Sequence, residues 1–556
     1  MEKRTILAII LSMLVIMIWQ LMFAPPAKKP VPKEEPVEKR VAKEREEEGS
    51  SEGVRDAMEA GQEVLRDVVV ETPLYRAVFT TAGARLKKWT LKEYKDRVQT
   101  VVLWRRKELG PPKPVQMISV EGSEDLPLAT EVQISGSHYG DVLFEADRSE
   151  LVVEEGDEGS IVFVGRLGEG LAIVKRYRFH GDEYSVDLNV ELINRGTTTV
   201  SPETTLNWYG VVGRSGRYTF AGPSVLSGNA VERLKVKEIK KGMRFTGDVK
   251  WMADEENYFV SLIAPRNIGD VTVEVRERQS ADAAQGVGFE NRMTFTREGV
   301  APGEKVGSSF RIYVGPKLPE LLKALDVEAE KAVNFGKYLG SIEKILLRFL
   351  EFAYDVTGNY GVAIIILSVL LKVIFWPLSR KSYRSMQEMQ KIQPEMKMLQ
   401  EKYKNDRQRL NQEMMALYKR RKVNPVGGCL PMLIQFPFLI ALYKALPLSF
   451  NLRHAPFLLW IQDLSAADTF FVDQLPLPLL GNTPVGPLPL LMGVSMLIQQ
   501  KMSPTMGDPR QARMMMIMPI MFIFIFLSFP SGLVLYWFVQ NLLTIGEQYL
   551  TKRRAR

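Results

Sequence analysis

One lysine stands inside a long apolar run in the last third of the chain. Lys372 is the only charged residue between Asn359 and Leu378. A charge at the centre of a membrane helix costs about 2.5–3.5 kcal/mol on insertion scales, so its side chain should face protein or water. Lys372 precedes Arg380, where a basic segment begins, by eight residues, which places it roughly 12 Å inside that boundary. This depth favours a functional, water-exposed ammonium. The alternative, snorkelling to the headgroups, would require local thinning of the bilayer.

Polar side chains also interrupt the neighbouring apolar runs. Ser368 precedes Lys372 by four residues, so both lie on one helix face. Taken one at a time, such residues often form hydrogen bonds between helices. Together with a charge and short neighbouring runs they predict a hydrated groove, lined by Lys372, Ser368, Gln435, Gln499 and Asn541.

Methionine and phenylalanine crowd a later run that begins at Met514. Such side chains adapt to varied apolar partners. They predict an apolar slide for client helices, although lipid contact or core packing would explain any single residue equally well. The residues assigned to this slide are Met432, Met515, Met518, Phe522 and Phe526.

Catalytic and metal-binding signals are weak. The three histidines, His138, His180 and His454, are far apart in sequence, and the single cysteine, Cys429, excludes an internal disulfide. The G-x-S-x-G match at Gly49–Gly53 lies in a charged segment rather than at a strand–turn–helix. No phosphate-binding loop is found. We therefore expect no cofactor and no enzymatic activity.

Six apolar runs predict a polytopic α-helical membrane protein. The first, Thr5 to Phe23, has 19 uncharged residues and is followed by Pro25 and Pro26, which favours an uncleaved anchor over a signal peptide. The last three are short, at 14, 16 and 15 residues, which predicts that either the bilayer thins around them or polar ends intrude into it. The remaining runs are Asn359–Leu378, Gly427–Leu448, Pro487–Gln500, Met514–Phe529 and Ser531–Ile545.

Charge sets the orientation of these spans. The net charge is +8, and the segment from Ser379 to Asn424 alone holds 13 Lys/Arg against 5 Asp/Glu. This segment, the N-terminus and the C-terminal tail all fall on one side of a six-span chain. The opposite loop, from Phe450 to Gly486, carries three aspartates and one arginine. The positive-inside rule makes the basic side, with both termini, cytoplasmic.

Between the first and second spans the pattern is that of strands. Tyr184, Val186, Leu188, Val190 and Leu192 alternate with polar residues, as in a half-buried strand. Gly181-Asp182 and Asn194-Arg195-Gly196 flank it as turn signals. Similar short strands recur from about Val68 to Val314, which predicts a large antiparallel β-sandwich.

The segments on either side of this domain have a different character. A tether from Pro25 to Asp67 mixes Pro, Lys and Glu without an apolar period. Leu318–Phe335 and Ser341–Tyr354 are expected to be helices. The second would place Ile342, Ile345, Leu346, Phe349 and Leu350 on one face, lying on the outer membrane surface or packing on the β domain.

The basic Ser379–Asn424 segment is expected to form two helices that break near Lys404–Asp406, with Pro394 interrupting the first. Its charge would suit ribosomal RNA, acidic lipid or acidic protein helices, with no specific nucleic-acid sequence. Each helix would carry one apolar stripe: Met386, Met389, Met396 and Leu399 on the first, and Met414, Leu417 and Tyr418 on the second. The basic residues assigned to partner contact are Arg380, Lys391, Lys404, Arg407, Arg420 and Arg421.

The chain therefore divides into an anchor (1–24), a charged tether (25–67), a β domain (68–316), linking helices (317–357), a second span (358–378), a cytoplasmic helical hairpin (379–424), four further spans (425–546) and a basic tail (547–556).

Several motifs, in order, resemble the YidC family of membrane protein insertases, in the form found in bacteria with two membranes. They cover about the last 200 residues closely, whereas the tether and the β domain match in position and class. The motifs are Trp376-Pro377-Leu378, Gln412 to Tyr418, Asn424-Pro425-Val426-Gly427-Gly428-Cys429, Ala455-Pro456-Phe457, Leu459-Trp460-Ile461, Gln500 to Thr505 and Phe529 to Tyr536.

The resemblance implies an insertase and folding chaperone of the inner membrane, acting on newly made membrane proteins alone or with the Sec translocon. It implies a five-helix bundle with a groove open to cytoplasm and lipid, and a β-super-sandwich in the periplasm. It also implies a positive side chain that attracts the acidic tail of a client. That residue is usually arginine in the family, and the position here holds Lys372, which keeps the charge but loses the planar fork.

Two other classes of function would leave different marks in the sequence. A small-solute transporter or channel would show inverted repeats and a charge near the midplane, and neither is apparent. An anchored periplasmic enzyme would need a catalytic constellation in the β domain.

Overall fold

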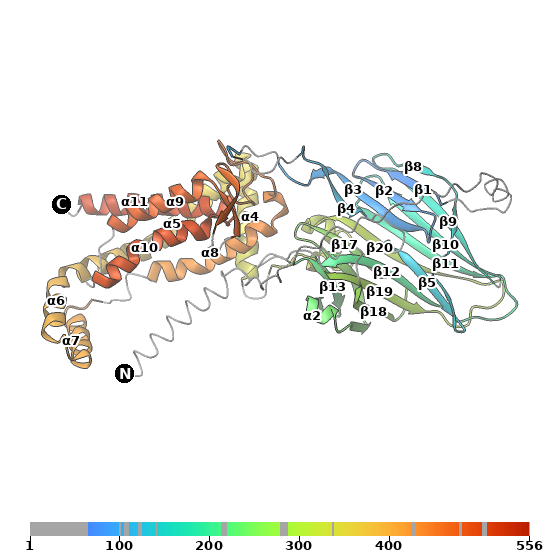
Figure 1. Cartoon of the computed structure of the whole chain (residues 1–556), viewed down its shortest axis with the longest axis horizontal. Coiled ribbons are helices and arrows are strands. Elements are labelled where there is room, and N and C mark those ends of the chain that lie inside the picture. Colours follow the sequence, from blue (N-terminus) through green and yellow to red (C-terminus); the bar gives the residue numbers. More distant parts are fainter. Residues whose placement is uncertain are drawn as a thin grey trace, which may run out of the picture. The chain divides into compact units, whose positions relative to one another are not determined.

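The computed structural model of the chain describes residues 65–98, 102–104, 110–119, 125–140, 142–168, 170–212, 220–278, 287–335, 339–423, 430–477, 481–502 and 509–554. The predicted first span, Thr5 to Phe23, and nearly all of the tether lie outside the described residues. Figure 1 shows the described part as a β domain, which comes first in the sequence, followed by a helical region.

Three sheets make up the β domain. Their strands pair antiparallel, except that β1 and β8 run parallel. The five-stranded sheet has the order β4 (Pro114–Ser119), β3 (Arg85–Lys95), β2 (Tyr75–Thr80), β1 (Asp67–Glu71), β8 (Glu150–Val152). The nine-stranded sheet has the order β14 (Ala230–Arg233), β13 (Gly222–Ser227), β16 (Val249–Glu255), β17 (Phe259–Arg266), β20 (Lys305–Pro316), β11 (Ser185–Asn194), β10 (Leu171–His180), β9 (Glu158–Gly168), β7 (Phe144–Ala146). The six-stranded sheet has the order β15 (Met243–Gly247), β18 (Val271–Arg278), β19 (Val287–Thr296), β12 (Glu203–Val212), β5 (Ala129–Ile134), β6 (Ser137–Tyr139). A short helix, α2 (Val236–Ile239), follows β14.

Strand β11 confirms the predicted alternation. Val186, Leu188, Val190 and Leu192 are buried, and the residues between them are partly exposed. The strand lies between β10 and β20 in the nine-stranded sheet, as can be followed in Figure 1. The turn signal after it is also found: the side-chain oxygen of Asn194 accepts from the backbone N–H of Gly196 at 2.9 Å.

One continuous apolar core joins the sheets. It contains Trp89 from the five-stranded sheet, Trp251 and Phe310 from the nine-stranded sheet, and Met293 and Phe295 from the six-stranded sheet. Because all three sheets contribute side chains to a single core, the domain is a β-sandwich, as predicted.

The segment between the β domain and the second predicted span departs from the prediction. A single helix over Leu318–Phe335 is wrong: the structure has α3 (Pro319–Lys323) and a 3-10 turn, η2 (Ala329–Ala332). The backbone between them takes positive φ at Asp326 (57°) and Glu328 (56°), which ends the helical path. The second helix is found as α4 (Gly340–Thr357).

The packed face of α4 also differs from the predicted one. Leu346 and Leu350 are buried as predicted, but Ile345 is 68% exposed and Glu343 is fully buried. The helix packs against α5 (Tyr360–Lys391) and α8 (Leu430–Leu448). The contact with α8 buries Glu343, because a lysine of that helix pairs with it.

Local sequence explains the break between α4 and α5. Gly358 takes the left-handed conformation that ends α4 (φ 67°), which glycine adopts without steric cost. Asn359 then caps α5, since its side-chain oxygen accepts from the N–H groups of Gly361 and Val362. The start of the predicted second span is therefore the start of a helix, but that helix continues through Leu378 to Lys391.

The other helices of this region are α9, α10 and α11, and Figure 1 shows them with α5 and α8. Their bounds are α9 (Pro487–Met502), α10 (Pro509–Phe526) and α11 (Ser531–Arg554). At 24 residues α11 is much longer than the 15 predicted, whereas α9, at 16, spans only about 24 Å. Between α8 and α9 lie a 3-10 turn, η3 (Phe450–Leu452), and a hairpin of β21 (Val472–Leu477) and β22 (Gly481–Val485).

These helices expose large apolar side chains in addition to those in their shared core. Exposed residues occur on α5, α8, α9, α10 and α11, and examples are Val373, Phe436, Val494, Ile517 and Leu542. Apolar surface of this extent is typical of contact with lipid. By length and composition, one described helix, α5, could cross a membrane, and 434–448 and 517–526 are shorter apolar helices.

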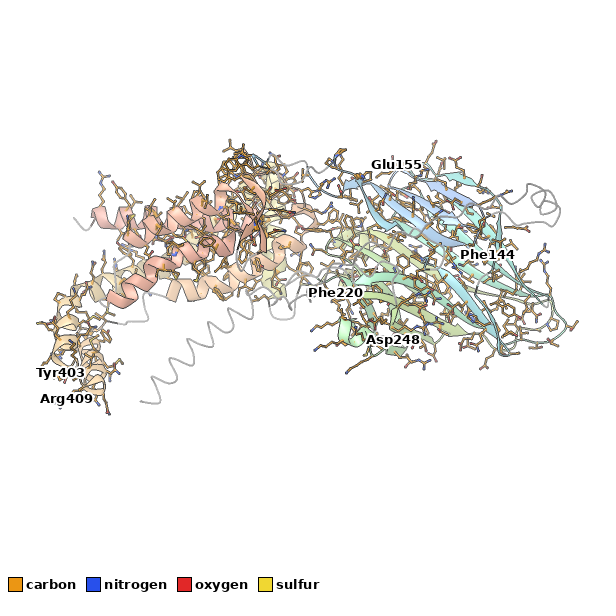
Figure 2. All side chains as sticks on the ribbon, in the orientation of Figure 1. Phe144, Glu155, Phe220, Asp248, Tyr403 and Arg409 are labelled. Atoms are coloured by element: carbon orange, nitrogen blue, oxygen red, sulfur yellow. The ribbon has the colours of Figure 1, made fainter. Side chains whose placement is uncertain are left out.

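Two short helices, α6 (Gln393–Lys402) and α7 (Arg407–Arg420), follow α5. The predicted interruption at Pro394 is found, because α5 ends at Lys391 and Pro394 lies in the first turn of α6. The predicted break near Lys404–Asp406 is also found, and Figure 2 shows Tyr403 and Arg409 on either side of it. A small apolar cluster joins the two helices; of the predicted stripes it includes Met389, Met396, Leu399, Met414, Leu417 and Tyr418.

Candidate functional site

Lys372 lies on α5 and points its ammonium at α11. Its Nζ is 2.8 Å from the Oε2 of Glu547 and donates a hydrogen bond to the hydroxyl of Thr544 at 2.9 Å. The side chains of Lys372 and Glu547 are each 16% exposed. The charge inside the apolar run is therefore held by an ion pair and a hydroxyl of a neighbouring helix.

This contact is the end of a longer polar connection. The hydroxyl of Thr544 donates to the carbonyl of Gln540 at 2.7 Å, and the Nε2 of Gln540 donates to the carbonyl of Ser368 at 2.8 Å. Gln540, Thr544 and Glu547 follow one another at i, i+4 and i+7, so they share one face of α11. We call Ser368, Lys372, Gln540, Thr544 and Glu547 the α5–α11 polar line.

Two other residues predicted for the groove, Asn541 and Gln435, have interhelical partners. Asn541 donates to the hydroxyl of Ser495 on α9 at 3.0 Å, and Gln435 on α8 donates to the hydroxyl of Tyr536 on α11 at 3.1 Å. Gln499 lies on α9 and is partly exposed. The structure thus brings Ser368 and Lys372 into one line, and it connects α11 to α9 through Asn541 and to α8 through Gln435.

Sequence reasoning missed two charged groups of this region. Glu547 lies two residues beyond the predicted end of the last span. Lys444 is a lysine within the predicted run Gly427–Leu448, and it pairs with Glu343 of α4 at 3.0 Å. Lys444 carries the same sequence signal as Lys372, a lone charge in an apolar run.

The predicted apolar slide is partly exposed and partly packed. Met518 is exposed and Phe522 is half-buried, whereas Phe526 is buried in the helical core. Both rings lie on Trp537 of α11, with centroids 5.8 Å away for Phe522 and 5.0 Å for Phe526. The side chains of Met432 and Met515 lie outside the described residues.

The basic residues predicted for partner contact are mostly at the surface. Lys404 and Arg420 are exposed, and the Arg380 guanidinium lies over the Trp376 ring, 5.8 Å from its centroid. Lys391 pairs with Glu388 at 2.6 Å, and Arg421 pairs with Glu395 across the two short helices. The side chain of Arg407 lies outside the described residues.

Buried charge in the β domain serves its structure. Lys175 is fully buried, and its Nζ donates to the carbonyls of Gly83, Ala84 and Leu128 at 3.0, 3.2 and 2.7 Å. Burial lowers the pKa of Lys175 well below its ordinary value. Its three acceptors are backbone atoms of neighbouring turns, so Lys175 holds those turns together. In the part of the chain that the structure describes, no three His, Cys, Asp or Glu side chains meet as a metal site would require.

Comparison with known proteins identifies both parts of the chain. Residues 67–349 match the family model of the YidC periplasmic domain, and residues 352–556 match that of the 60Kd inner membrane protein. The membrane protein insertase YidC of Pelobacter propionicus is 39% identical over 99% of this chain and 99% of its own length. That of Geobacter sulfurreducens is 37% identical over 100% of this chain and 98% of its own length.

A solved structure, that of an active YidC insertase with its first transmembrane domain resolved, is 18% identical and has a TM-score of 0.37. It covers 87% of this chain and 92% of its own. The family assignment comes from the full-length sequence matches and the two family models. With its β-sandwich domain and its membrane helical region, the chain belongs to the YidC family of membrane protein insertases, which is not a family of enzymes.

Proposed function

We propose that the helical region inserts apolar segments of newly made membrane proteins into the inner membrane through a hydrated groove open to cytoplasm and lipid. Lys372 would attract an acidic residue in the polar tail of the client. The observation that supports this most is the α5–α11 polar line, which runs to a cation between helices whose other faces expose apolar side chains.

Energetics explain why such a site would suffice. An apolar segment of about 20 residues gains on the order of 6–12 kcal/mol on entering the bilayer, from roughly 0.3–0.6 kcal/mol for each strongly apolar residue. The obstacle is the polar tail that must cross with it. A positive charge and hydrogen-bonding groups inside the membrane lower that barrier, so apolar burial itself can drive insertion.

The apolar segment of the client would slide along α8 and α10. The exposed Met518, together with Met521 and Phe524, supplies adaptable surface on α10. Phe522 and Phe526 pack on Trp537 of α11 and so hold α10, with its exposed surface, against that helix. Met432 and Met515 belong to the same proposed slide.

The proposal extends to topology and partners. With Thr5–Phe23 as an uncleaved anchor, six spans would place both termini in the cytoplasm and the β domain, as a super-sandwich, in the periplasm. The basic α6–α7 pair and the tail would contact the ribosome and anionic lipid, through Arg380, Lys391, Lys404, Arg407, Arg420 and Arg421. Insertion would proceed alone or with the Sec translocon.

A photo-crosslinking amino acid at position 372 tests the groove. It is compared with the same probe at position 373, since Val373 is the next residue of α5 and is 63% exposed. Nascent chains of a client with a short acidic tail are presented to inverted membrane vesicles. We expect crosslinks to the client from position 372 and far fewer from position 373. No client crosslink at 372, or equal yields at both positions, would overturn the groove.

A further inference from the structure

The ion pair of Lys372 places an acidic residue of the protein itself where a client's acidic residue is proposed to bind. We infer that Glu547 is a resident counter-ion, which pairs with Lys372 when no client is bound. An entering client must displace the Glu547 carboxylate, so Glu547 sets how acidic the tail of a client has to be. This inference rests on the proposed groove and adds to it a specificity-determining residue.

Most of the N–H donors of the Lys372 ammonium already have partners within the protein. An ammonium has three N–H donors, and two of them are engaged, by the Glu547 carboxylate at 2.8 Å and the Thr544 hydroxyl at 2.9 Å. Both partners come from one face of α11. Thr544 is fixed in turn by its bond to the Gln540 carbonyl, and Gln540 by its bond to α5.

The pair has two physical consequences. A carboxylate beside Lys372 lowers the free-energy cost of keeping a cation among apolar helices, since an unpaired charge there is unfavourable. The same carboxylate cancels most of the field that would attract a client. Exchange of one carboxylate for another conserves the pairing of Lys372, so an acidic client can compete with Glu547. A client with a neutral tail offers no replacement and leaves the resident pair closed.

The partial exposure of Lys372 and Glu547 suits replacement of the Glu547 carboxylate by that of a client, rather than a permanent ion pair. At 16% each, both side chains keep some contact with the surroundings of the helices, unlike Glu343, which is fully buried in its pair with Lys444. A displaced Glu547 lies seven residues before the end of α11 at Arg554, next to the basic tail, so its carboxylate can return to water. In the Glu343–Lys444 pair, by contrast, the carboxylate is fully buried, as in an ion pair that only stabilises the fold.

The test uses the full chain in inverted vesicles and two clients that differ only by Asp or Asn in a short tail, with insertion measured by protease protection. In the Glu547→Gln variant, insertion of the Asp client should rise roughly two- to fivefold, the range that corresponds to losing a partly exposed competing ion pair. Insertion of the Asn client should stay unchanged. Glu547→Asp, which keeps the charge, should behave like the parent chain.

Two further variants separate the role of the charge from effects on folding. In a Lys372→Gln background the Glu547→Gln change should have no effect, because there is no cation left to unmask. Leu550→Ala, at an exposed position of the same helix outside the α5–α11 polar line, should leave the preference for the Asp client intact. Thermal unfolding of each purified variant shows whether it is folded.

Separate outcomes overturn the inference and the groove. Suppose that the parent chain prefers the Asp client and that the probe at position 372 crosslinks to it. If folded Glu547→Gln then inserts that client no faster, the resident counter-ion is refuted and the groove stands. If the parent chain treats both clients alike and position 372 gives no crosslink, the groove itself fails.

Discussion

Both lysines that lie among the apolar side chains of α5 and α8 have a carboxylate partner on another helix. Lys372 pairs with Glu547 of α11, and Lys444 pairs with Glu343 of α4. Burying a pair costs desolvation free energy on both sides, which the mutual attraction offsets only with good geometry. Removing one partner leaves the other charge unpaired. Single and paired substitutions should therefore differ strongly in their effect on the free energy of unfolding.

The Glu343–Lys444 pair offers the clearest test of this difference. Lys444→Met should destabilise the detergent-solubilised protein by about 3 kcal/mol or more, because the fully buried Glu343 carboxylate loses its partner. Adding Glu343→Gln should recover much of that loss, since the remaining polar group is neutral. Denaturant unfolding of the three variants measures both steps. A single Lys444→Met variant as stable as the parent would show that the pair contributes nothing.

Of the four residues in these two pairs, only Lys372 is among the site residues predicted from the sequence. Lys372 was predicted to be functional because a lone charge in an apolar run is expensive, and Lys444 carries the same signal. Their partners could not be predicted in the same way, since Glu343 is 101 residues from Lys444 and lies outside the predicted apolar face of its helix. Glu547 follows the last apolar run and resembled part of the basic tail. Contacts between distant segments depend on helix packing, which hydropathy does not encode.

At the scale of elements, the starts of helices were easier to predict than their ends. Asn359 caps α5, and Pro394 falls in the first turn of α6, because these residue types have specific roles at helix N-termini. The ends of α5 and α11 lie 13 and nine residues beyond the predicted spans. Hydropathy marks where a helix could cross a bilayer, whereas a helix continues as long as its backbone finds partners and no breaker intervenes. In the polar line only Glu547 lies on the part of α11 beyond the predicted span, whereas Gln540 and Thr544 lie within it.

Packing between α6 and α7 gives a prediction for these elements. Leu417 is 2% exposed in the cluster that joins them, so Leu417→Ala should weaken their contact by about 2–3 kcal/mol. Hydrogen exchange of backbone amides in α6 and α7 should become faster, with exchange in the β domain unchanged. Met415→Ala is the matched control on the same helix, since Met415 is 51% exposed. Equal exchange in both variants would mean that the cluster does not hold the two helices together.

At the scale of the whole chain, charge and apolar surface are separated by segment. The β domain has its own continuous core, and its buried charges, such as Lys175, are satisfied within it. The helical region instead exposes apolar side chains on most of its helices, and its basic excess is concentrated between Ser379 and Asn424. This distribution is what a protein partly surrounded by lipid requires. It supports a cytoplasmic position for α6 and α7, and a periplasmic position for the loop that carries β21 and β22.

Cysteine labelling tests that topology, because the chain has one natural cysteine that can be replaced by Cys429→Ser. New cysteines are placed at the exposed positions Asn405, between α6 and α7, and Gln474, on β21. A membrane-impermeant maleimide should label Gln474→Cys in spheroplasts and Asn405→Cys only in inverted vesicles. A third variant, Ser50→Cys in the tether, should follow Gln474→Cys if Thr5–Phe23 crosses the membrane as an uncleaved anchor. Labelling of the Gln474 and Asn405 variants from the same side would contradict the proposed set of spans. Labelling of Ser50→Cys together with Asn405→Cys would contradict a first span that carries the chain from a cytoplasmic N-terminus to a periplasmic tether.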